Sequence, residues 1–202
     1  MSKLNTVLIT VSNIKTGETY RSRSYPNDDF NNNGKIELYT TPVFKVFIEN
    51  NLPAQKKEWK ALRFMPYWND PAKPDSKYRT KGWANSGLSH FPKTVVSYYN
   101  PNYGVHNRYS PYGGAIQIKG NFLIHAGPET IDESGWGAAG CVEIIGNFDL
   151  FKEDIKLLSG STETNAHDAI LKLVAAKKLF VRVDLAVAPK LKNFLWGEVE
   201  RP

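Results

Sequence analysis

Alternating hydrophobic and polar positions predict several short strands along the chain. Val7, Ile9 and Val11 alternate with Leu8, Thr10 and Ser12, and Gly17 is expected to turn this first strand back toward Tyr20 in a hairpin. The same kind of pattern predicts strands over 43–49, 115–119, 122–125, 141–145 and 180–185. The sequence pattern therefore favours a protein built mainly of β-strands.

Helical periodicity is confined to a few segments. A short helix is expected within 51–59. Asn147 is placed to cap a helix over 148–158 that ends at Gly160, and Asn165 to cap a second over 166–177. The predicted fold class is mostly β (α+β), a β-sandwich or partly closed sheet with two helices near the C-terminus. We expect one domain over residues 1–202.

The stretch from 64 to 114 is dominated by prolines, glycines, asparagines and aromatic residues. A loop of this length in a compact domain is usually functional, although its aromatic rings equally serve to pin the chain to the core. Tyr112, near the end of the stretch, is predicted to contact substrate.

Composition narrows the class of partner. The chain is 41% hydrophobic and 23% charged, with a net charge of +6 and a pI near 9.2. A basic surface favours anionic partners, but the basic residues are scattered in pairs rather than gathered in a stripe, so no nucleic acid partner is predicted. No segment has the length of a membrane span, and no apolar leader follows Met1. A monomer is expected.

Reactive residues gather in the middle of the chain. Cys141 is the only cysteine, so it has no internal disulfide partner, and it follows the small-residue run 135–140 that ends in Gly140. His125 ends one predicted strand and Cys141 begins another. If the two strands are antiparallel neighbours, thiol and imidazole meet, which is the minimal pair for covalent catalysis.

Side-chain alternation adds Glu143 to this group. If Ile124 and Val142 face the core, then His125, Cys141 and Glu143 share the opposite face. A lone cysteine is also commonly a small buried hydrophobic residue. No metal or other cofactor is predicted, because the histidines and the cysteine lack ligand spacing. The segment starting at Asp29 resembles part of a calcium-binding loop, but its twelfth position is Thr40, and it equally makes a polar turn.

Around these residues the chain resembles the L,D-transpeptidase catalytic domain of the YkuD type, which acts on bacterial peptidoglycan. That family has a histidine about sixteen residues before the cysteine of a Ser-His-Gly-Cys-aliphatic-Arg motif; here His125 and Cys141 have this separation, and 140–142 match. Its Thr-Pro strand entry and opening strands resemble 41–46 and the predicted hairpin over 7–20. The sequence departs from the motif at Ala138, Ala139 and Glu143.

The resemblance implies a transpeptidase or peptidase acting on peptidoglycan stem peptides through a thioester at Cys141, in the periplasm, cell wall or extracellular space. It also implies that the carbonyl of Ala126 orients His125, while the N–H groups of Gly140 and Cys141 are candidate oxyanion donors. Glu143 is predicted to bind an amine of the substrate, to orient His125, or to pair with a cation from 64–114. The alternatives are an inactive wall-binding or structural module and a sortase-like enzyme with Arg182 as its arginine.

Overall fold

The computed structural model describes residues 4–29, 31–52, 55–68, 82–84, 90–104, 110–138, 140–187 and 195–201. In chain order the described elements are β1 (Val7–Arg23), β2 (Tyr25–Pro26), β3 (Ile36–Asn50), β4 (Lys56–Leu62), β5 (Met65–Trp68), β6 (Gly82–Ala84), β7 (Phe91–Val95), β8 (Tyr99–Asn100), β9 (Ala115–Lys119), β10 (Phe122–Ala126), β11 (Ser134–Trp136), β12 (Val142–Ile145), α1 (Phe148–Ser159), α2 (Ala166–Ala175), β13 (Leu179–Val183) and β14 (Leu195–Val199).

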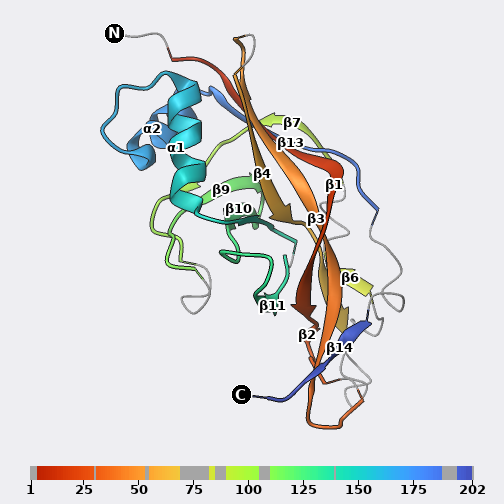
Figure 1. The fold of residues 1–202 in the computed structure, drawn as a ribbon. Helices are drawn as coiled ribbons and strands as arrows, with labels where there is room; N and C mark the ends of the chain where they lie inside the picture. Colours follow the sequence, from red (N-terminus) through yellow and green to blue (C-terminus); the bar gives the residue numbers. More distant parts are fainter. Residues whose placement is uncertain are drawn as a thin grey trace.

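A large mixed sheet organises the molecule. Its main path runs β7-β13-β1-β3-β4-β12-β10-β9-β8, with β11 added to β1 and β14 added to β3. The long antiparallel strands β1 and β3 form its spine and extend from the helices to the opposite end of the molecule (Figure 1). A smaller sheet joins β2, β5 and β6. The predicted mostly-β class is confirmed at this level.

Both predicted C-terminal helices are present. The Asn147 side chain accepts a hydrogen bond from the Leu150 N–H at the start of α1, and Gly160 ends that helix in a left-handed conformation. The Asn165 side chain accepts from the Asp168 N–H at the start of α2. These caps satisfy backbone N–H groups that have no partner within the helix, which is why the local sequence sets the helix boundaries well.

The expected hairpin at Gly17 is wrong. β1 continues through Gly17 and pairs with β3 over its whole length, with register irregularities between Val11 and Lys15 and between Lys15 and Thr19. Gly17 has a φ of 91°, a conformation that glycine adopts without steric strain. The glycine therefore marks a bulge that bends a long strand rather than a turn that ends it.

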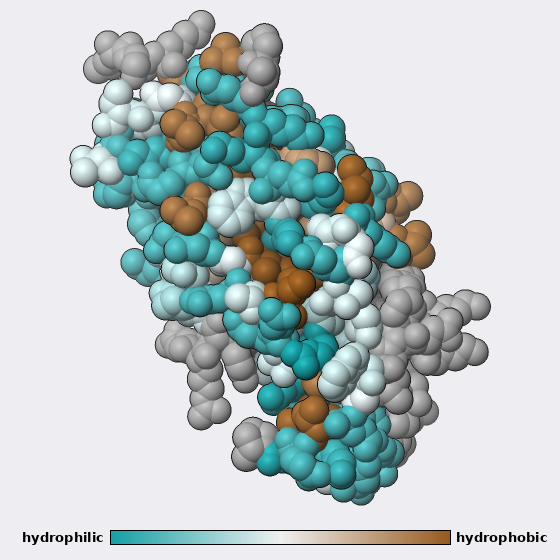
Figure 2. Space-filling model, viewed as in Figure 1, coloured by the Kyte–Doolittle hydropathy of each residue, from teal (hydrophilic) through white to brown (hydrophobic). Residues whose placement is uncertain are grey.

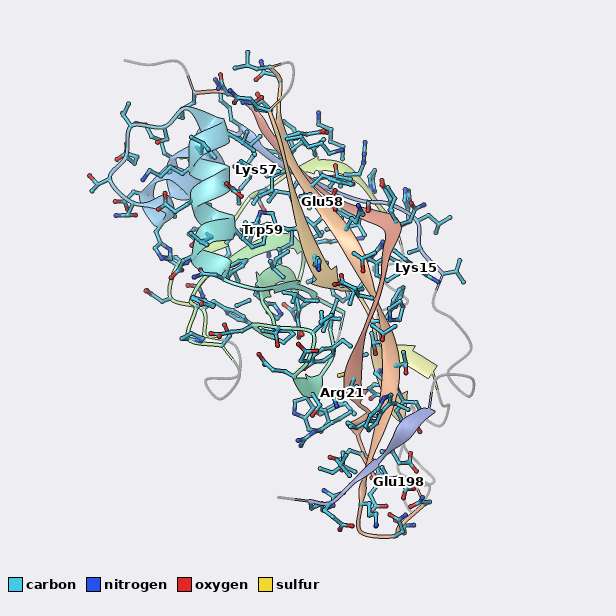
Figure 3. The ribbon with its side chains drawn as sticks, in the orientation of Figure 1. Lys15, Arg21, Lys57, Glu58, Trp59 and Glu198 are labelled. Atoms are coloured by element: carbon cyan, nitrogen blue, oxygen red, sulfur yellow. The ribbon has the colours of Figure 1, made fainter. Side chains whose placement is uncertain are left out.

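The expected helix within 51–59 is also wrong, because β4 begins at Lys56. Trp59 points from β4 toward α1 (Figure 3), where its ring meets Phe151 edge-to-face at 5.6 Å. Its indole N–H donates to the Asp154 carboxylate at 3.0 Å. Packing against α1 on one side and pairing with β3 and β12 at the edges favours the strand.

The main core lies between the helices and the sheet. It contains Phe148, Phe151 and Ile155 from α1 together with Ile124 of β10 and Val142 of β12. Ile124 and Val142 are thus buried on the core side of their strands, as the alternation predicted. This fixes which neighbouring side chains must point to the other face of the sheet.

Candidate active site

The strands that hold the reactive residues are adjacent, but they are parallel. Ile124, His125 and Ala126 of β10 pair with Val142, Glu143 and Ile144 of β12. The predicted antiparallel arrangement is therefore wrong. The connection from 127 to 141 is long enough for a parallel crossover, and on its way it adds β11 to the edge of β1.

This register agrees with the prediction that His125 and Glu143 lie on the same face of the sheet. His125 and Glu143 occupy directly paired positions, opposite in direction to the core residues Ile124 and Val142. Cys141 immediately precedes β12 and comes level with Leu123, two positions before His125. From strand spacing and rise, the Cα atoms of Cys141 and His125 are about 8 Å apart, on a diagonal rather than face to face.

His125 is held by its own backbone neighbour. Its Nδ1 lies 2.8 Å from the carbonyl oxygen of Ala126, and the side chain is buried. A carbonyl oxygen only accepts hydrogen bonds, so Nδ1 carries the proton and the lone pair is on Nε2. This is the contact that the resemblance implied for Ala126, and it leaves the imidazole in the tautomer of a general base.

The thiol of Cys141 is half-buried and protonated at rest. Burial raises its pKa, a hydrogen bond from the Leu123 backbone lowers it, and the charge of Glu143 raises it again, for a net increase. The sulfur also donates a long hydrogen bond, 3.9 Å, to the carbonyl oxygen of Asn121. Nucleophilic attack by this thiol therefore requires a base to remove its proton.

Glu143 is not an ordinary carboxylate. Burial raises its pKa to about 8, so at neutral pH it is mostly an uncharged carboxylic acid. Gly127 packs closely against Glu143, since a Cβ on Gly127 would come within 2.8 Å of the Glu143 Cβ. Within the described part of the chain Glu143 forms no ion pair, so the cation expected from 64–114 is not found there.

Gly140 is required by its conformation and its surroundings. Its φ is 90°, and a Cβ there would lie 2.6 Å from the ring of Phe122. Its backbone N–H donates to the Ala138 carbonyl oxygen at 2.9 Å. The prediction that Gly140 supplies an oxyanion donor therefore does not fit this arrangement, because the donor is already used. Ala139 lies outside the described residues.

Tyr103 is an aromatic residue at the site that sequence reasoning did not single out. Its ring centroid lies 5.9 Å from that of His125, and burial raises its pKa, with the charges of Cys141 and Glu143 adding to the increase. Tyr112, predicted to contact substrate, is partly buried against the main core and interacts with Glu129. Nothing in the sequence distinguishes Tyr103 from the other tyrosines of the 64–114 stretch.

A buried lysine fixes the chain that carries Tyr103. Lys152 of α1 donates to the Gly113 carbonyl oxygen at 2.8 Å and pairs with Asp149 at 2.6 Å. The next residue, Gly114, donates its N–H to the Tyr103 carbonyl oxygen at 2.8 Å. Lys152 also lies 3.3 Å from His167 Nε2, so the helices and the loop over His125 belong to one hydrogen-bonded network.

Two alternative sites are not supported by the geometry. In the segment that resembles a calcium loop, the Asp29 carboxylate accepts the N–H groups of Asn33 and Gly34, and the Asn31 and Asn33 amides bond to Glu198. The polar groups thus close a turn, and no cluster of three or more His, Cys, Asp or Glu suited to a metal occurs among the described residues.

The sortase-like alternative depends on Arg182. This residue lies on β13 and pairs with Asp184 at 3.0 Å. Strands β1, β3 and β4 separate β13 from β12, a distance of about 19 Å along the sheet. Arg182 therefore does not accompany Cys141, and this prediction is not retained.

Comparisons with protein-family models, with curated proteins and with solved structures found no match for this chain. Neither helix of the described ranges is long and apolar enough to cross a membrane. The geometry at His125, Cys141 and Glu143 is the feature that points to a function for this chain.

Proposed function

We propose that the protein is a cysteine-dependent acyltransferase or peptidase that acts on peptidoglycan stem peptides. The observation that carries this is the hydrogen bond from His125 Nδ1 to the Ala126 carbonyl oxygen, on a strand adjacent to β12, which Cys141 immediately precedes. This hydrogen bond holds His125 in the tautomer that can act as a general base, on the sheet face where Cys141, the only cysteine of the chain, lies.

The chemistry begins with proton transfer. His125 Nε2 removes the thiol proton as the sulfur of Cys141 attacks a stem-peptide carbonyl carbon, forming a C–S bond. The C–N bond of the amide then breaks, and the proton on Nε2 passes to the leaving amine. An acceptor amine resolves the thioester into a new amide, and water resolves it into a carboxylate. In either case the C–S bond breaks and the proton returns to sulfur.

Glu143 adds a further property to this site. A substrate ammonium group placed beside it would favour ionisation of the carboxyl and form an ion pair away from water. Free amines occur on the diamino acid of stem peptides, and this supports that substrate class. Without such a group, the carboxyl stays protonated at neutral pH and does not repel the forming thiolate.

Intact-protein mass spectrometry tests the proposal. Purified stem peptides should produce a covalent adduct on the wild-type protein whose mass equals the acyl fragment, and product analysis should identify a new amide or a hydrolysed peptide. Cys141→Ala should give neither, and His125→Gln should slow adduct formation by about 10²-fold or more. Equal turnover by wild type and Cys141→Ala would refute the proposal.

A further inference from the structure

A row of aromatic rings and guanidinium groups runs along the end of β1 that is distant from the helices. Tyr25 meets Trp136 edge-to-face at 5.9 Å, and the Arg23 guanidinium carbon stands 6.0 Å from the centre of the Trp136 ring. Arg21, on the same side of β1 as Arg23, stands 5.2 Å from the centre of the Trp196 ring. Figure 3 shows Arg21 at this end of the spine.

The row offers both ring surface and positive charge. Tyr25 is 49% exposed and Trp196 is 53% exposed, values that are high for large aromatic side chains. Neither Arg21 nor Arg23 forms an ion pair within the described ranges. Arg21 does donate to the carbonyl oxygen of Asp132, which fixes its position without neutralising it.

The row is continuous with the candidate active site. β11 pairs with β1 so that Trp136 lies opposite Arg23, and the chain then runs directly on to Cys141. Cys141 is five positions after Trp136 in the chain, so their Cα atoms are at most about 18 Å apart. A peptide of a few residues, at about 3.5 Å each, spans that distance. A polymer held on the row could thus present a peptide branch to the thiol.

On the face of the molecule that Figure 2 shows, hydrophobic residues form separate patches among hydrophilic ones, not one continuous apolar surface. Half-exposed rings stand here beside guanidinium groups that form no ion pair with any described residue. This combination suits a ligand that has flat, weakly polar ring faces and carboxylates. A sugar polymer with carboxylate-bearing peptide branches has both. Its rings stack on Tyr25 and Trp196, and its carboxylates accept from Arg21 and Arg23.

We infer that this row, Tyr25, Trp136, Arg21, Arg23 and Trp196, binds the glycan strand of polymeric peptidoglycan and thereby selects glycan-linked stem peptides over free ones. The inference rests on the proposed function for its choice of polymer. Single-stranded nucleic acid also stacks on aromatic residues beside arginines, and it is the competing occupant that the test must separate.

Binding without turnover provides the test. In a Cys141→Ala background, the protein is incubated with purified insoluble peptidoglycan sacculi, and the bound fraction is measured by co-sedimentation. Trp196→Ala and Arg21→Gln should each raise the apparent Kd by about tenfold. Tyr98→Ala, which removes an equally exposed ring elsewhere, and Lys15→Gln, which removes an exposed positive charge, should leave it unchanged. Melting temperatures of all variants should match the parent.

The outcomes are distinguishable. Undiminished binding by Trp196→Ala and Arg21→Gln overturns the inference, as does displacement of the sacculi by a single-stranded oligonucleotide of equal or higher affinity. Loss of binding in these two variants alone, with no effect of the oligonucleotide, supports it. Failure of the wild type to form an acyl adduct with free stem peptides would refute the proposed chemistry but leaves this binding result to be judged separately.

Discussion

His125 and Glu143 lie directly opposite each other on the parallel strands β10 and β12. A titratable base and a buried carboxyl are thus placed side by side on the sheet face where Cys141 also lies. Glu143 holds its proton up to a pH of about 8 because burial disfavours the charged form. The carboxyl and the thiol are therefore both uncharged at neutral pH, and negative charge develops on them only when reaction or substrate favours it.

The stability of the protein should fall as pH rises through the titration of Glu143. The folded state binds this proton up to about pH 8, whereas the ordinary pKa of the group is 4.5. Between these values the folded state holds more protons than the unfolded state, so the free energy of unfolding decreases with pH. We expect the wild-type melting temperature to drop by roughly 5 °C or more from pH 5 to pH 9.

Glu143→Gln should remove this pH-dependent component, because the amide resembles the protonated acid and does not ionise. Differential scanning calorimetry at several pH values measures both proteins. Glu58→Gln, which changes an exposed carboxylate on β4, should keep the wild-type slope. Parallel curves for wild type and Glu143→Gln would show that Glu143 does not titrate in this range.

Reactivity of Cys141 toward iodoacetamide should report its raised pKa. Alkylation depends on the thiolate, so the midpoint of the rate-against-pH curve should lie above that of an ordinary cysteine. Replacing Glu143 by Gln removes the negative charge that develops above pH 8 and should move the midpoint to lower pH, with faster alkylation at pH 9. An unchanged midpoint in Glu143→Gln, or the same shift in Glu58→Gln, would contradict an effect of Glu143 on the thiol.

Local sequence patterns predicted the parts of this structure that depend on near neighbours. Asn147 and Asn165 cap α1 and α2 because an N-cap acts within three residues of itself. Alternation indicated that His125 and Glu143 face away from the core, because side-chain direction has a period of two along any strand. These inferences need no knowledge of which strands become partners.

Which strands become partners, and in which direction, was not predictable from local sequence patterns. The same alternation fits parallel and antiparallel pairing, so the β10–β12 direction depends on the course of 127–141, including its pairing with β1. Gly17 gave the same local indication for a bulge as for a turn. Tyr103 contacts His125, its carbonyl oxygen accepts from Gly114, and Gly113 accepts from Lys152; such long-range contacts leave no periodic pattern in the sequence.

Tyr103 should limit access to the thiol. Its ring lies beside His125, and the charges of Cys141 and Glu143 affect its hydroxyl. Tyr103→Ala should increase the rate of Cys141 alkylation by about three- to tenfold at saturating thiolate, because removing the ring opens the half-buried sulfur. Tyr103→Phe keeps the ring and should stay close to the wild-type rate. If both variants, or neither, react faster, the ring does not shield the thiol.

Adding a side chain at Gly140 should reduce stability by more than the strain of its positive φ alone. Gly140 and Gly17 have nearly the same φ, 90° and 91°, but a Cβ would meet the Phe122 ring at 2.6 Å on Gly140 and nothing within 4 Å on Gly17. Alanine at either position incurs the strain of a positive φ, about 1–2 kcal/mol, and only Gly140→Ala adds the clash. Chemical unfolding should therefore show a larger loss of stability for Gly140→Ala than for Gly17→Ala.

A smaller side chain at position 122 should partly relieve the extra loss of stability in Gly140→Ala, because it removes the ring that the new Cβ meets. Phe122→Leu combined with Gly140→Ala should lose less stability than the sum of the two single changes, by about 1 kcal/mol, because the residues are in contact. Iodoacetamide kinetics provide the second readout, since Cys141 follows Gly140 directly: Gly140→Ala should alter thiol reactivity and Gly17→Ala should not. Equal stability losses in the two alanine variants, with strict additivity in the double variant, would mean that Phe122 moves aside at no cost and that Gly140 serves only its own backbone angle.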